Sequence, residues 1–183
     1  VFNSYLNKKF NSNHINRTGI TVTGLQYDLD YKISPNFGLD VPMEQISKGN
    51  GGSCVLSAYS SSVINLSNHL TTSLGITAQY FTLNKNWTVE PRAALKWSFN
   101  PKHALALAYG LHSRREKLDY YFVEQEANGK TESNRYLDFS KAHHFGLTYD
   151  WNINSYMHLK VEPYYQYLFR IPVEENSSFS IIN

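Results

Sequence analysis

Hydrophobic and polar residues alternate with a period of two along much of this chain. In residues 103–111 the large apolar side chains occupy the odd positions, and small side chains occupy the even positions. In residues 87–99 the apolar side chains again take odd positions, and every charged residue of the segment takes an even position. A period of two is that of a β-strand, whose successive side chains point to opposite faces, whereas a helix would spread both sets around its circumference.

The same alternation predicts seven strands, over residues 17–33, 53–66, 70–82, 87–99, 103–111, 143–151 and 157–169. In the first of them the apolar positions change phase, from Ile20 and Val22 to Leu25 and Tyr27. We expect a β-bulge near Thr23–Gly24, because one extra residue would restore a single apolar face.

The predicted connections alternate in length. Short turns are expected at 67–69, 100–102 and 152–155, and long polar loops at 34–52, 114–141 and 170–178, with the short 84–86 as an exception. The Gly-rich residues 49–52 are expected to be a flexible loop. Most strands exceed the roughly 5–6 residues typical of soluble sheets and are long enough to cross a bilayer. The fold class is therefore predicted as all-β: an antiparallel meander of about seven long strands, forming part of a transmembrane outer-membrane β-barrel.

Composition supports this prediction and excludes other classes. Only 17% of the 183 residues are charged, whereas aromatic residues make up 15%. The aromatic side chains gather near the predicted strand ends, as expected at two membrane interfaces, and the clearest are Trp87, Trp97, Phe99, Trp151 and Tyr167. A net charge of +2 argues against a nucleic-acid partner, and a single cysteine excludes an intrachain disulfide.

Two sets of side chains are candidates for binding. Five charged residues share the polar positions and are predicted to face a barrel lumen: Glu90, Arg92, Lys96, Lys160 and Glu162. They would contact a plug or a passing substrate, or form a charge ladder that solvates the lumen. Five residues of the 114–141 loop are candidate ligand contacts, unless the loop is an ordinary polar one: Arg114, Arg115, Tyr120, Tyr121 and Phe122.

Catalytic, metal and cofactor sites are not predicted. His143 and His144 are adjacent on a strand and point to opposite faces, so they cannot chelate one ion together. No Ser-His-Asp set, carboxylate pair or Cys/His cluster stands in a convincing context. We therefore expect a protein that is not an enzyme and carries no cofactor.

Three segments carry a resemblance to a known family. Residues 87–113, 141–150 and 159–169 resemble the barrel of Bacteroidetes-type TonB-dependent outer-membrane receptors, with Glu-Pro-Arg at 90–92 and Glu-Pro-Tyr-Tyr at 162–165 as the more specific elements. Residues 1–52 fit less distinctively. The resemblance implies an energised importer with a barrel of about 22 strands and an N-terminal plug. The plug region, which would bind the TonB-type energy-coupling protein, has no counterpart in this chain.

We therefore expect residues 1–183 to be a partial barrel domain, a piece of a longer receptor in the bacterial outer membrane. The chain begins at Val1 without Met, and a new alternation starts at Phe179 and Ile181. The expected partners are outer-membrane lipid, a small-molecule or oligomeric nutrient, and the energy-coupling protein through the missing region. Two alternatives stay open: a small closed outer-membrane barrel with a structural or adhesion role, and a soluble ligand-binding β-barrel.

Overall fold

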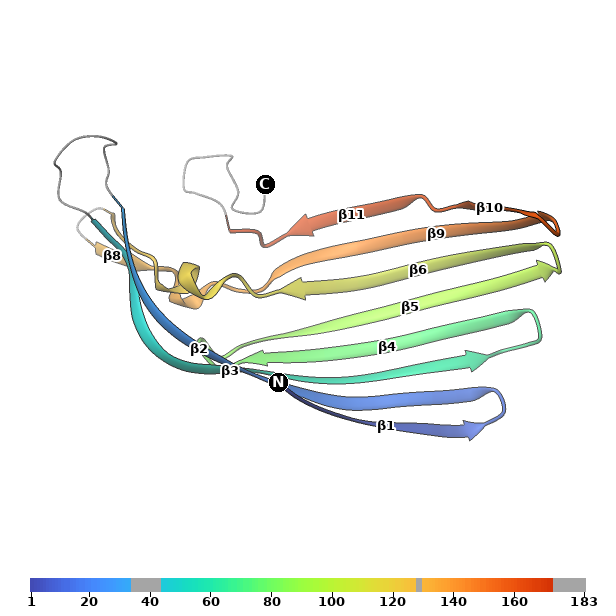
Figure 1. Ribbon diagram of the computed structural model, residues 1–183, viewed down its shortest axis with the longest axis horizontal. Helices are drawn as coiled ribbons and strands as arrows, with labels where there is room; N and C mark the ends of the chain where they lie inside the picture. Colours follow the sequence, from blue (N-terminus) through green and yellow to red (C-terminus); the bar gives the residue numbers. More distant parts are fainter. Residues whose placement is uncertain (34–43, 128–129, 173–183) are drawn as a thin grey trace.

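A single antiparallel sheet dominates the computed structural model, which describes residues 1–33, 44–127 and 130–172 (Figure 1). Its strands are β1 (Phe2–Asn11), β2 (His14–Ile33), β3 (Glu44–Asn65), β4 (Leu70–Phe81), β5 (Asn86–Asn100), β6 (His103–Arg114), β9 (Ser140–Asn154), β10 (Met157–Val161) and β11 (Tyr164–Phe169). Strands β1 to β6 pair in chain order, β9 follows β6, and β10 and β11 both pair with β9. The prediction of an all-β antiparallel meander is confirmed. The sheet is open, because among the described strands β1 does not pair with β10 or β11.

The two ends of the sheet differ in their connections. Tight turns at 12–13, 66–69, 101–102 and 155–156 share one end, which we call the short-turn end. At the opposite loop end, residues 82–85 join β4 to β5, and a long loop (115–139) joins β6 to β9. This loop contains η1 (Leu118–Phe122), β7 (Glu124–Ala127), β8 (Lys130–Ser133) and η2 (Asn134–Tyr136). The other predicted long loops lie largely outside the described residues, at 34–43 and 173–178.

Helices contribute little to this fold. Both η1 and η2 are short 3-10 turns within the 115–139 loop. No helix in the described part of the chain has the length and hydrophobicity needed to span a membrane.

The strand register gives every strand the same two faces. Residues paired across an antiparallel ladder share a face, and the chain of pairs runs unbroken from β1 to β11. One face, the apolar face, carries Ile20, Leu56, Ile76, Leu95, Leu107, Phe145 and Leu159, all of them exposed. The other, the polar face, carries Ser57, Thr77, Arg92, Ala108, His144 and Lys160.

The N-terminal third differs from the sequence prediction. β1 was not predicted, and β3 begins at Glu44 and so includes the supposedly flexible residues 49–52. Gly51 pairs with Tyr27 of β2, and Gly49 pairs with Leu29. The ring of Phe122 packs so closely on Gly49 that an added Cβ would lie only 2.8 Å from it. Partners from distant parts of the chain therefore order a segment whose local sequence favours flexibility.

The predicted bulge at Thr23–Gly24 is wrong. The β2–β3 ladder is continuous from His14 to Tyr31, and its only shift lies between Tyr31 and Lys32. The apolar residues change face because their surroundings change. Beyond Val22 the polar face of β2 is covered by the 115–139 loop, so Leu25 packs beneath that loop instead of on the apolar face.

The small hydrophobic core sits at the loop end, on the polar-face side. Val55 and Phe81 are paired residues of β3 and β4, and Tyr121 and Phe139 come from the 115–139 loop. Phe81 is completely buried, and its ring meets Tyr121 edge-on at 5.3 Å between centroids. The apolar side chains packed around these four are Leu25, Leu83, Leu118, Phe122 and Leu137. The core fixes the loop over the polar face.

Two ladders are interrupted at a Glu-Pro dipeptide. The β5–β6 ladder ends at Arg92↔Gly110, so β5 residues before Arg92 pair only with β4, and the two strands diverge toward the loop end. The predicted strand 157–169 is split at 162–163 into β10 and β11, yet both halves keep the same register against β9. Proline has no backbone N–H to donate, which accounts for an interruption at each site.

Candidate functional site on the polar face and its covering loop

All five residues predicted to face a lumen lie on the polar face. Glu90 and Arg92 sit where β5 parts from β6, and Lys96 pairs with Thr71 and Ala106 nearer the short-turn end. Lys160 and Glu162 lie at the far edge and form an exposed ion pair of 2.8 Å. The structure therefore groups Glu90 with Arg92 and Lys160 with Glu162, and does not join the two groups. That this face lines a lumen stays a prediction.

Glu90 is a buried carboxylate with a full set of partners. Its Oε1 accepts hydrogen bonds from Gln79 Nε2 at 2.5 Å and from the Ser113 backbone N–H at 3.2 Å, and its Oε2 pairs with Arg92 at 2.7 Å. The Ser113 hydroxyl also donates to Oε1. Only 2% of the Glu90 side chain is exposed. The β5–β6 ladder ends before Ser113, so the carboxylate supplies the acceptor that a β5 carbonyl would otherwise provide.

A histidine and tyrosine cluster on the polar face was not predicted. The rings of His112 and His144 lie 4.5 Å apart between centroids, and the Tyr164 hydroxyl is 2.6 Å from His144 Nδ1. Gly110 permits this arrangement, because a Cβ there would lie 2.8 Å from His112 Nε2. The period-two pattern assigns both histidines to polar positions, but only the β6–β9 register shows that they meet.

A hollow of about 740 Å³ connects these groups. Its polar lining includes Gln79, Glu90, Arg92, His112, His144 and Tyr164, together with serine and threonine hydroxyls of β3 and β4. Hydroxyl, amide, imidazole and guanidinium groups can each bind a polar solute by hydrogen bonding. The polar face thus offers a binding surface for polar solutes.

The five loop residues predicted as ligand contacts differ in accessibility. Tyr121 is buried in the core, where it packs rather than faces solvent, and its hydroxyl accepts the Glu116 backbone N–H at 3.2 Å. Burial raises the pKa of the Tyr121 hydroxyl. Tyr120 and Arg115 are half-buried, and Arg114 is exposed. Phe122 is half-buried beneath the Arg135 guanidinium, 4.7 Å from its ring centroid.

Glu116 anchors the start of this loop. Its carboxylate is buried, accepts a hydrogen bond from the Ser140 hydroxyl, and lies 3.5 Å from the Arg114 guanidinium. Because Ser140 begins β9 and Arg114 ends β6, this contact ties the two ends of the loop together. The sequence offered no signal for this role, since Glu116 stands among charged residues of an evidently polar loop.

The five predicted interface aromatics lie on the apolar face, at both ends of the sheet. Trp97 and Phe99 are exposed near the short turns, and Trp151 is half-buried beside them. Stacking joins this group through His103, whose ring centroid is 5.7 Å from that of Phe99 and 5.6 Å from that of Trp151. Trp87 and Tyr167 are exposed toward the loop end.

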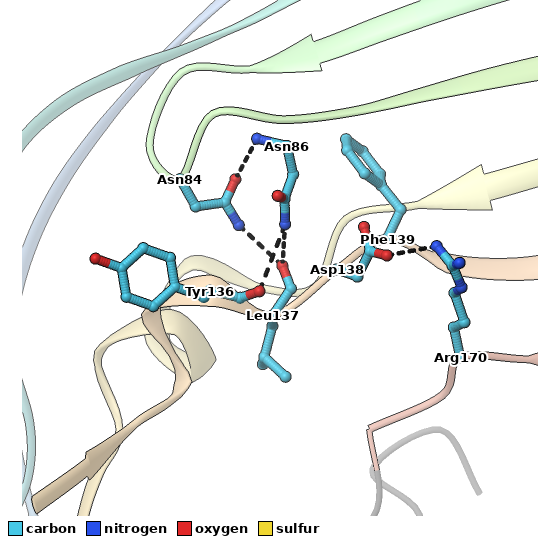
Figure 2. Close-up of polar contacts among 7 residues, drawn as sticks. All are labelled: Asn84, Asn86, Tyr136, Leu137, Asp138, Phe139 and Arg170. Carbon is cyan, nitrogen blue, oxygen red and sulfur yellow. Dashed lines mark hydrogen bonds and ion pairs between the residues drawn. The ribbon is translucent and has the colours of Figure 1, made fainter.

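A polar junction at the loop end fastens the 115–139 loop to β5 and β11 (Figure 2). Asn84 and Asn86 both donate side-chain hydrogen bonds to the Leu137 carbonyl, at 2.8 and 2.9 Å. Asp138 forms an ion pair of 2.5 Å with Arg170, just beyond β11. Sequence reasoning missed this junction because its members lie far apart in the chain.

Neither metal-binding geometry nor similarity to known proteins assigns a role to these residues. The described residues contain no group of three or more His, Cys, Asp or Glu side chains placed to hold a metal ion. Searches of known protein families, curated proteins and solved structures found no match to this chain.

Proposed function

We propose that this chain forms part of the barrel wall of a TonB-dependent receptor in a bacterial outer membrane, and that its polar face lines the path of an imported nutrient. The observation that carries the proposal is the apolar face shared by the strands from β2 to β11 and left exposed. A membrane barrel needs such a face toward lipid, with a polar interior and aromatic rings at both interfaces.

The position of the 115–139 loop supports this orientation. The loop packs on the polar face through Val55 and Phe81. In a soluble barrel the apolar face would form the interior, and the core would build up on that side. Here the only buried cluster of the described residues lies on the other side, which favours a polar interior partly covered by the loop.

Membrane insertion is tested with a variant that keeps Trp97 as its only tryptophan, through Trp87→Phe and Trp151→Phe. In vesicles of phosphatidylcholine brominated on its acyl chains, we expect strong quenching of Trp97 fluorescence. The matched control removes Trp97 as well and carries Tyr136→Trp, on the exposed loop. Its fluorescence should be quenched weakly, and equal quenching at both positions would refute the proposed orientation.

Nutrient import is tested in cells whose growth depends on the receptor that contains this chain. His144→Ala, which alters the lining of the polar-face hollow but leaves the Glu90–Arg92 ion pair intact, is expected to reduce uptake of the nutrient while leaving the amount of receptor in the outer membrane unchanged. Removal of the energy-coupling protein should abolish uptake. Uptake that persists without that protein would contradict a TonB-dependent function.

A small closed barrel is a second candidate, because the sheet has an even number of strand positions. If β10 and β11 count as one interrupted strand, the main sheet has eight positions, the number in the smallest bacterial barrels. Closure would bring β1 against β11. A disulfide between Ser4→Cys and Tyr165→Cys, in a chain with Cys54→Ser, would form readily in a closed barrel and not within a wider wall.

A further inference from the structure

A second hollow lies at the loop end of the sheet and shares no residue with the polar-face hollow. Its volume is about 460 Å³, and it is lined by Asn86, Trp87, Thr88, Val89, Asp138, Lys141 and Arg170. By register, Trp87 and Lys141 belong to the apolar face. The hollow therefore opens where the apolar face gives way to the polar loops.

The charge of this hollow is positive. Arg170 is paired with Asp138, whereas the Lys141 ammonium has no ion-pair partner in the described part of the chain. Two cations against one carboxylate leave one net positive charge. The guanidinium also keeps donors beyond the nitrogen that contacts Asp138, since arginine carries five N–H groups.

Arg170 is positioned by the structure around it. The Phe139 backbone N–H donates to Asp138 at 3.0 Å, and the Phe139 ring is buried in the core. Arg170 adopts a φ of 53°, a left-handed conformation that is uncommon outside glycine. Figure 2 shows Asp138 and the Arg170 side chain pointing toward each other across the junction. The ion pair with Asp138 thus places the Arg170 guanidinium at the hollow.

Trp87 supplies the second half of the site. Its indole is 68% exposed at the end of the apolar face. Indole rings settle at the headgroup level of a bilayer, where one edge meets apolar chains and the N–H meets polar groups. A cationic hollow beside such a ring matches an amphiphile that has an anionic head and acyl chains.

We infer that this hollow binds the phosphate of an anionic membrane lipid, with Lys141 and Arg170 on the phosphate oxygens and Trp87 against the upper part of the acyl chains. This inference rests on the proposed membrane function, because it needs the apolar face to lie in lipid. Guanidinium and ammonium donors form strong charge-assisted hydrogen bonds to phosphate.

The experiment uses a variant in which Trp87 is the only tryptophan, through Trp97→Phe and Trp151→Phe. Phosphatidylcholine vesicles receive a small fraction of either acyl-brominated phosphatidic acid or acyl-brominated phosphatidylcholine. We expect phosphatidic acid to quench Trp87 at lower concentration. Lys141→Gln and Arg170→Gln should each reduce this preference about fivefold, the effect of one surface cation on binding to an anionic lipid.

Three controls make the result decisive. Lys102→Gln, at the short-turn end, should leave the preference unchanged, and Lys141→Arg should retain it, which separates loss of charge from loss of folding. Added inorganic phosphate should not relieve the quenching. No preference for phosphatidic acid, an equal loss in Lys102→Gln, or relief by free phosphate would each overturn the inference.

The failure of this inference is distinguishable from failure of the proposed function. If Trp97 is quenched by brominated lipid and Trp87 shows no preference for phosphatidic acid, the sheet lies in the membrane and the phosphate site is refuted. If Trp97 is not quenched, the membrane function itself is refuted.

Discussion

Glu90-Pro91 and Glu162-Pro163 are the same dipeptide in two settings. A ladder is interrupted at each dipeptide, and each glutamate pairs with a cation two residues away, Arg92 in one case and Lys160 in the other. Glu90 is 2% exposed and receives further hydrogen bonds from β4 and β6, whereas Glu162 is 55% exposed and has only Thr148 as a further partner. The difference lies in the neighbours: donors from β4 and β6 flank Glu90, whereas no described strand lies beyond Glu162.

This comparison shows that a charged side chain matters more for stability inside the sheet, where it is buried, than at the sheet edge, where it is exposed. A buried carboxylate is costly unless every partner stays in place, whereas an exposed ion pair contributes little. The exposed Glu162 pair therefore has no structural role comparable to that of the buried Glu90 pair. We expect substitutions at the two sites to differ in their effect on stability.

The largest effect is expected where the 115–139 loop packs on the sheet. Phe81→Ala deletes the fully buried ring that holds the loop and should destabilise the fold by about 4 kcal/mol. Trypsin should then cut the loop after Lys117 and Arg135. Tyr136→Ala, at an exposed position of the same loop, is the matched control, and an unchanged digestion pattern in Phe81→Ala would contradict this role of the core.

Removing the carboxylate of each glutamate tests the comparison directly. Glu90→Ala leaves Gln79, the Ser113 N–H and Arg92 without their acceptor and should cost about 3 kcal/mol. Glu162→Ala should leave stability unchanged within error. Urea unfolding in detergent, followed by circular dichroism, measures both, and similar losses at the two sites would show that burial is not the deciding factor.

A smaller effect is expected from pH at the covering loop. The pKa of Tyr121 is raised by burial, so the folded loop holds the phenol proton more tightly than the unfolded loop does. Its contribution is complete below about pH 10, the ordinary tyrosine pKa, and is lost as pH rises above it. Protease protection of the loop should fall above pH 10. Tyr121→Phe should lack this component of the fall, and Tyr120→Phe should keep it.

The smallest effect is expected at the exposed Glu162-Pro163 dipeptide. Pro163→Ala restores a backbone N–H between β10 and β11, which already share one register against β9. One added ladder hydrogen bond should stabilise this edge by about 1 kcal/mol or less. Amide exchange in β10 and β11 would measure the gain, and faster exchange than in the unchanged protein would speak against it.

The sequence predicted most of the sheet because β4 to β6 and β9 to β11 carry a clear period-two pattern. β1 escaped prediction because Tyr5 and Leu6 are adjacent and so stand on opposite faces, which means that its apolar residues do not separate. Residues 49–52 were misassigned because their order comes from β2 and Phe122, which are remote in sequence.

The candidate site was predictable only in part. Alternation places Glu90 and Glu162 on the same face, and the structure agrees. Both stand in a Val-Glu-Pro sequence, so their immediate neighbours in the chain do not reveal that only Glu90 is buried. That difference comes from Gln79 of β4 and Ser113 of β6, which donate hydrogen bonds to Glu90 across the sheet.

The pairing order of the sheet has a consequence for how the protein is assembled. Each strand from β1 to β6 pairs with its neighbour in the chain, so the sheet can grow hairpin by hairpin in the order of synthesis. Joining β9 to β6 instead requires closing the loop over residues 115–139, and closure of a long loop carries an entropic cost before its contacts form. The β6–β9 pairing therefore carries a larger loop-closure cost than the hairpins with short turns, and the small core lies at the loop that must close.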